Sequence, residues 1–156
     1  MKKLLIPSIF FVLLISFSFA QKPYKVVFYN LENFFDTIND PEVLDDEFTP
    51  DGPKKWNTAK YNKKLNNTER VLFDIAAIDK NYPIVIGVSE VETRGVLEDI
   101  VATPKLAPAN YRIAHFDSPE ARGVDVAFLY RPDVFKIEGQ YPVKTVIPSL
   151  PHFKTR

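Results

Sequence analysis

The order of two strand-like segments around one helix-like segment constrains this chain more than any other feature. Residues 25–29 and 84–88 are nearly continuous runs of β-branched and aromatic residues, a pattern typical of strands covered on both faces. Between them, residues 58–78 carry apolar side chains mostly every three or four positions, as in an amphipathic helix. A strand, a helix and a second strand in this order predict a crossover unit with parallel strands, and therefore an α/β fold.

The other segments continue this pattern. Turn signals fill residues 36–56, which we interpret as a surface excursion over the end of the sheet. Thr93 is a suitable cap for a short helix after the second strand. Residues 111–116 and 125–130 are two further predicted strands, joined by a polar turn. On the long helix we place the lysines, Lys64 included, on the outward face.

Residues 1–20 have the composition of an export signal. Lys2 and Lys3 precede an apolar run. Small residues stand at Ser18 and Ala20, the two positions that a signal peptidase reads, so we expect cleavage after Ala20. The mature chain would then be secreted or periplasmic, without a stable membrane span. The alternative is an uncleaved anchor, for which the run is slightly short, since a spanning helix needs about 20 apolar residues.

Composition excludes several classes of protein. The chain has 156 residues, of which 20 are basic and 20 acidic, so its formal charge is +0 and a broad basic footprint for nucleic acid is absent. DNA or RNA would have to be bound by a local site. The chain has no cysteine, which excludes disulfides, thiolate zinc sites and lipid attachment through cysteine. Residues 21–156 amount to one small domain at most.

Polar side chains follow both of the predicted parallel strands. Asn30 and Glu32 come after the first strand, and Glu90 ends the second. The crossover unit brings these strand ends together at the edge where open α/β sheets bind ligands. Magnesium takes oxygen ligands and usually only one or two protein carboxylates, which Glu90 and Glu32 could supply, while the amide of Asn30 could bind phosphate. The alternative is that these are ordinary polar residues at strand ends.

Three blocks of the sequence resemble the endonuclease/exonuclease/phosphatase superfamily: FYNLENFFD at residues 28–36, IGVSEVE at residues 86–92 and RGVDVAFLYRP at residues 122–132. That superfamily includes DNase I-like nucleases, abasic-site endonucleases, bacterial sphingomyelinases and inositol polyphosphate phosphatases. The resemblance implies a four-layer α/β sandwich of the DNase I-like type. It also implies hydrolysis of phosphate esters with Mg²⁺, for which Mn²⁺ or Ca²⁺ are alternatives.

The resemblance further implies residue roles. Asn30 matches an asparagine that contacts phosphate or orients a catalytic aspartate. Glu32 matches an acidic position near the metal, and Glu90 matches the principal metal ligand. Arg122 stands where family members often place a phosphate-facing polar group. Asp125 begins a strand and is either a site residue or a turn cap.

Family members complete their site with histidines and acidic residues that have no counterpart in these three blocks. A histidine paired with a carboxylate is the natural base for activating water near neutral pH, and we recognise no such pair. We interpret His115 as a structural histidine, and His152 has no matching motif. We therefore expect an N-terminal part of the domain that is inactive alone and exposes the inner face of one sheet. The base would lie beyond Arg156, and the complete protein would be a monomer.

The sequence thus predicts an exported, magnesium-dependent phosphodiesterase, in the first place an endonuclease acting on DNA or RNA. A lipid or inositol phosphate phosphatase similar to sphingomyelinases is an alternative, which the neutral charge slightly favours. A noncatalytic secreted binding module is an alternative from another class. In that case the carboxylates would bind calcium for structure, and residues 45–47 would contact a partner.

Overall fold

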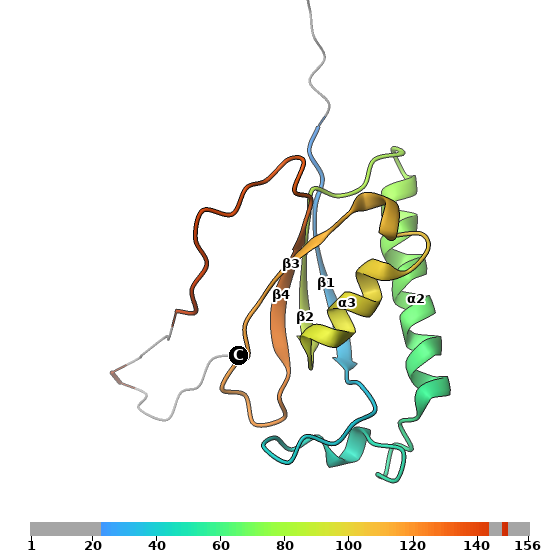
Figure 1. The fold of residues 1–156 in the computed structure, drawn as a ribbon, viewed down its shortest axis with the longest axis vertical. Coiled ribbons are helices and arrows are strands. Elements are labelled where there is room, and N and C mark those ends of the chain that lie inside the picture. The colour runs from blue at the N-terminus through green and yellow to red at the C-terminus, as the bar shows by residue number, and fades with distance from the viewer. Residues whose placement is uncertain (1–22, 144–147, 150–156) are drawn as a thin grey trace, which may run out of the picture.

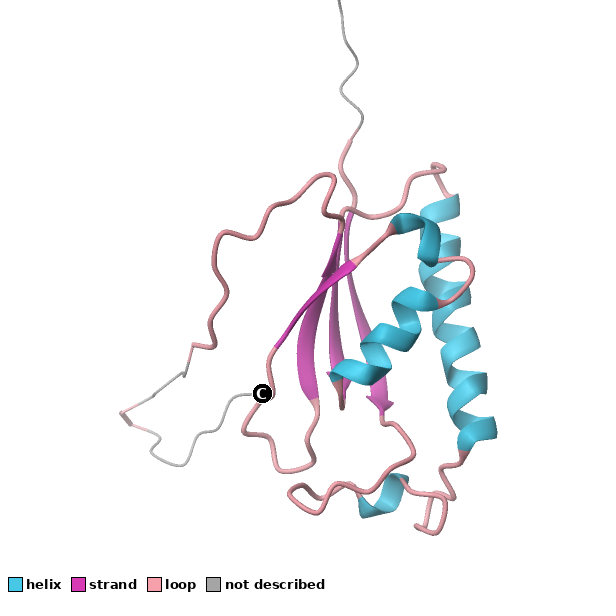
Figure 2. Ribbon diagram, in the orientation of Figure 1, coloured by secondary structure: helices cyan, strands magenta, loops and turns pink. Residues whose placement is uncertain are grey.

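The computed structural model describes residues 23–143 and 148–149, which form a four-stranded sheet with two α-helices on one face (Figures 1 and 2). The strand order is β1-β2-β4-β3. The predicted export signal and His152 lie outside the described residues. Within the described part of the chain, no helix has the length and apolar character needed to cross a membrane.

The predicted crossover unit is present. β1 (Val26–Phe34) and β2 (Val85–Val91) pair in parallel, and α2 (Thr58–Ala77) connects them. The helix begins where expected because the side chain of Asn57 accepts a hydrogen bond from the backbone N–H of Lys60. The mixed α/β prediction is therefore confirmed. Both strands continue beyond their predicted ends and include the polar residues of the candidate site.

The two later strands complete the sheet by antiparallel pairing. β4 (Asp125–Tyr130) pairs with β2, and β3 (Arg112–His115) pairs with β4. α3 (Arg94–Ala102) follows β2, with the side chain of Thr93 as its cap, as predicted. Two short three-ten helices, η1 (Asp46–Phe48) and η2 (Ala107–Ala109), lie in the connections. The end of β3 and the start of β4 therefore reach the same sheet edge as the carboxyl ends of β1 and β2 (Figure 1).

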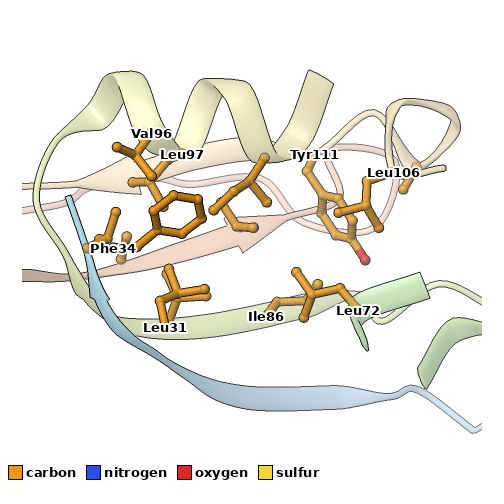
Figure 3. Packing of buried hydrophobic residues seen from close by; sticks show 14 residues of the cluster. Leu31, Phe34, Leu72, Ile86, Val96, Leu97, Leu106 and Tyr111 are labelled. Atoms are coloured by element: carbon orange, nitrogen blue, oxygen red, sulfur yellow. The ribbon is translucent and has the colours of Figure 1, made fainter. Parts of the chain in front are cut away.

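The hydrophobic core lies between the sheet and the two helices (Figure 3). Residues of β4 alternate between buried and more exposed positions, because successive side chains of a strand point to opposite faces. Fully enclosed core side chains come from the sheet and from both helices, among them Phe34, Leu72, Ile86, Leu97, Ile100 and Leu129. Their burial fixes which face of the sheet the helices cover.

The opposite face of the sheet carries exposed apolar side chains. Phe28 is 69% exposed and Phe128 is 55% exposed. Gly87 lies between them on β2, and a Cβ atom at this position would come within 2.8 Å of the Phe28 ring. The missing side chain thus lets the two rings approach across the central strand. The apolar strands predict that both faces of the sheet are covered. Among the described residues only one face is covered, so these residues form two layers and not the four of a sandwich.

The acidic excursion of residues 36–56 is docked against the sheet edge. The backbone N–H of Leu44 donates to the carbonyl of Ala121 at 2.8 Å, which joins the excursion to the turn between β3 and β4. The rings of Phe35 and Phe48 stack with their centroids 4.0 Å apart. These contacts give the segment a small core of its own.

Glu92 anchors the start of the same excursion. Its carboxyl group is buried and accepts a hydrogen bond from the backbone N–H of Asp36 at 2.7 Å. Burial raises the pKa of Glu92 to about 8, and the negative charges of Asp36 and Asp45 act in the same direction. Because the folded state holds this proton more tightly than the unfolded chain, the group stabilises the fold most at acidic pH. That contribution is lost as the pH rises through about 8.

We expect the uncovered sheet face to cause self-association of the chain, because contiguous exposed apolar patches mark association surfaces. The double variant Phe28→Thr/Phe128→Thr should shift size-exclusion elution toward the monomer while keeping the fold. Ile78→Thr, which changes an exposed apolar residue outside this face, should leave elution as it is. A monomeric unmodified chain would contradict the prediction.

We also expect Glu92→Gln to weaken the pH dependence of stability. Glutamine keeps an acceptor oxygen for Asp36 without a titrating proton. Between pH 5.5 and pH 8.5 in chelator, the melting temperature of the unmodified chain should fall further than that of the variant, by more than about 3 °C. Glu42→Gln, at an exposed position, is the control and should behave as the unmodified chain. Parallel pH profiles for the unmodified chain and Glu92→Gln would refute the assignment.

Candidate metal and phosphate site

Glu90 is the inserted residue of a β-bulge. Ser89 pairs with Val126 and Val91 pairs with Asp125, so Glu90 lies between two paired positions of β2. Its φ of 60° is in the left-handed region, which costs an L-residue roughly 1–2 kcal/mol. Bulges of this kind occur next to active sites, where they re-aim a side chain. The bulge therefore interrupts the alternation of side chains between the two faces of β2 and changes the direction of Glu90.

β1 is irregular at the same level of the sheet. Its pairing with β2 shifts register between Asn30 and Phe34. Within this interval Glu32 and Asn33 have φ values of 56° and 59°. The side-chain oxygen of Asn30 accepts a hydrogen bond from the backbone N–H of Glu32 at 2.7 Å, which holds the turn and leaves the amide hydrogens of Asn30 for a ligand.

Lys64 of α2 binds the irregular end of β1 and lies within electrostatic range of Glu90 in β2. Its ammonium group donates to the carbonyl oxygens of Glu32 at 2.6 Å and Asn33 at 3.3 Å. Burial lowers the pKa of Lys64, and the negative charges of Glu32 and Glu90 oppose this shift. Both carboxylates therefore lie within electrostatic range of one ammonium group. The prediction that Lys64 lies on the outward face of the helix is wrong, because its side chain reaches the end of β1 and is half-buried.

Arg122 connects the turn between β3 and β4 to the end of β1. Its guanidinium donates to the side-chain oxygen of Asn33 at 2.9 Å and to the carboxylate of Glu120 at 3.1 Å. The next residue, Gly123, has a φ of 75°, and a Cβ atom there would lie 3.1 Å from Val43. Both the conformation and the space favour glycine at this position. Arg122 is thus held beside the strand ends with further N–H groups that could bind phosphate.

Asp125 and His115 form a buried pair at the same edge. The Nε2 atom of His115 lies 2.9 Å from the Oδ2 atom of Asp125, and the two side chains are 4% and 2% exposed. The other carboxylate oxygen of Asp125 accepts the backbone N–H of Ser118 at 2.7 Å, so Asp125 acts as a turn cap. The expectation that the sequence holds no histidine–carboxylate pair is therefore wrong. The register of β3 against β4 brings the two side chains together, and no local pattern in the sequence sets that register.

Two groups of side chains could hold a cation. Glu32 and Glu90 offer carboxylate oxygens from adjacent strand ends, a donor set that suits magnesium. The second group consists of His115, Asp117 and Asp125, which offer one ligand atom each within 4.8 Å of one another. In that group the histidine is already hydrogen-bonded to Asp125, so a metal would have to replace this contact. Magnesium takes oxygen ligands, and the carboxylates at the ends of β1 and β2 offer oxygen atoms alone, so this pair fits magnesium better than a group that includes a histidine nitrogen.

A comparison with known families identifies the chain. A family model described as the endonuclease/exonuclease/phosphatase family matches residues 25–156, which include β1 to β4 and all the residues of the candidate site. No significant match was found among curated proteins or among solved structures. Members of the matched family hydrolyse phosphate esters. The chain belongs to the endonuclease/exonuclease/phosphatase family.

Proposed function

We propose that this protein is an exported, magnesium-dependent endonuclease or related phosphodiesterase, built as a four-layer sandwich to which the described residues contribute one sheet and its helices. The proposal rests on one observation above all. The only non-glycine residues of β1 and β2 with positive φ are Glu32, Asn33 and Glu90, and they lie at adjacent strand ends. Backbone strain of this kind clusters at functional sites.

The described residues suit the binding of a metal-bound phosphate. A divalent cation at this edge would stabilise negative charge on the phosphoryl oxygens and the leaving group. Glu90 and Glu32 would hold the cation, while the amide of Asn30 and the guanidinium of Arg122 would donate hydrogen bonds to the phosphate. Lys64 maintains the backbone turn that presents Glu32. The buried pair of His115 and Asp125 positions the turn that carries Arg122.

The decisive comparison is between two neighbouring glutamates. In the natural protein carrying this chain, Glu90→Gln should lower magnesium-dependent phosphodiesterase activity by about 100-fold or more at limiting magnesium, because even residues that only support a metal ligand contribute about 10–100-fold to metal affinity. Glu92→Gln should stay close to the unmodified protein, since Glu92 binds the backbone of Asp36 and not the metal. Activity is measured on DNA, RNA, sphingomyelin and inositol phosphates, with chelator as the blank.

Equal activities of the two glutamate variants, at both limiting and saturating magnesium, would show that Glu90 is the wrong carboxylate. Hydrolysis that persists in chelator would refute the metal requirement itself.

Export is the part of the proposal that rests on the N-terminal sequence. The basic start, the apolar run and the small residues at Ser18 and Ala20 motivate it. Mass spectrometry of the periplasmic or secreted protein should find Gln21 as its first residue. A membrane fraction that contains the protein with Met1 intact would contradict this.

A further inference from the structure

We propose that the cleft between β1 and α2 binds the phosphodiester backbone of a nucleic acid strand beside the hydrolytic site. The inference rests on the proposed function and names its substrate class as DNA or RNA. The cleft has a volume of about 350 Å³. The residues of its lining that carry the argument are Asn30, Glu32, Trp56, Lys60, Lys63 and Lys64.

The cleft is continuous with the candidate site. Asn30 and Glu32 line the cleft and also stand at the irregular end of β1, where the candidate phosphate and metal ligands lie. A strand lying in the cleft would therefore have one of its phosphates at the ends of β1 and β2. A substrate with a single phosphate group would use the strand ends and leave the cleft empty.

The charge of the chain is divided between two adjacent segments. Residues 36–51 contain seven acidic and no basic residues. Residues 54–70 contain one acidic residue and six basic ones, namely Lys54, Lys55, Lys60, Lys63, Lys64 and Arg70. The described lining of the cleft includes three of these lysines and no residue of the acidic segment. The formal charge of +0 thus hides a local basic surface that suits a polyanion.

Two of the three lysines of the cleft are held in place by hydrogen bonds to the backbone. The ammonium group of Lys60 donates to the carbonyl of Lys54 at 2.6 Å, and that of Lys64 donates to the carbonyl of Glu32 at 2.6 Å. An ammonium group has three N–H donors, so each lysine keeps donors for a phosphate oxygen. Lys60 lies three residues before Lys63 and four before Lys64, so it neighbours both on the surface of α2, and all three line the cleft.

An aromatic wall favours a nucleic acid over an inositol phosphate or a lipid headgroup. Trp56 and Tyr29 line the cleft, and both are only partly buried. The indole N–H of Trp56 donates to the carbonyl of Phe35 at 3.0 Å, which fixes the ring. Bases of a single strand stack on such rings while basic side chains follow the phosphates.

The test measures binding without hydrolysis. Fluorescence anisotropy of a labelled single-stranded oligonucleotide of 15 nucleotides, DNA or RNA, is recorded with the full chain in chelator across a salt series. The double variant Lys60→Gln/Lys63→Gln should bind about tenfold more weakly at low salt, and its slope of log affinity against log salt should be smaller by about 1 to 1.5, because each phosphate contact on a single strand contributes about 0.7. Lys136→Gln removes an exposed lysine outside the cleft and should match the unmodified chain.

An unchanged salt slope in the double variant would overturn the inference, and so would an equal loss in Lys136→Gln. Tighter, lysine-dependent binding of inositol hexakisphosphate or of phosphatidylserine vesicles would also overturn it and assign the cleft to another substrate class. The proposed hydrolysis is tested separately, in the natural protein carrying this chain, with bis(p-nitrophenyl) phosphate and magnesium. Lysine-dependent oligonucleotide binding without any hydrolysis would refute the proposed activity but would still support the cleft as a binding site for nucleic acid.

Discussion

The parallel pairing of β1 with β2 is the constraint on which the candidate site depends. A strand, a helix and a strand in sequence close into one sheet by a crossover, and this brings the carboxyl ends of both strands to one edge. Glu32 and Glu90 are 58 residues apart in the chain, yet the negative charges of both favour the protonated form of Lys64 and so act to raise its pKa. The antiparallel pairing of β4 with β2 adds Asp125 directly opposite Val91, the neighbour of Glu90.

The irregular strand ends need support from the rest of the structure. Three left-handed residues at one edge together cost several kcal/mol at roughly 1–2 kcal/mol each, so surrounding contacts must stabilise them. Lys64 binds the carbonyl oxygens of Glu32 and Asn33, and Arg122 binds the side chain of Asn33. A helix and a turn from opposite sides of the edge thus hold the same short segment of β1. Lys64 and Arg122 therefore support the geometry of the strand end in addition to the phosphate contacts proposed for them.

The two faces of the sheet have different roles. One face buries its side chains under α2 and α3, whereas the other presents Phe28 and Phe128 with Gly87 between them. The near-continuous apolar strands indicated two apolar faces correctly, but the described residues cover only one. The basic cleft lies at the free edge of β1, where this strand meets α2.

The sequence by itself determined the elements whose signals are local. The cap at Thr93, the period of α2 and the limits of β4 follow from neighbouring residues, so they could be predicted before any tertiary structure was known. The sequence also indicated Asn30, Glu32 and Glu90 as candidates, because each stands where an apolar run ends. Only the tertiary structure decided that Lys64 turns inward, that His115 pairs with Asp125 and that Glu92 is buried beside Asp36. These contacts join separate elements, and their partners depend on strand order, register and bulges, which no local pattern encodes.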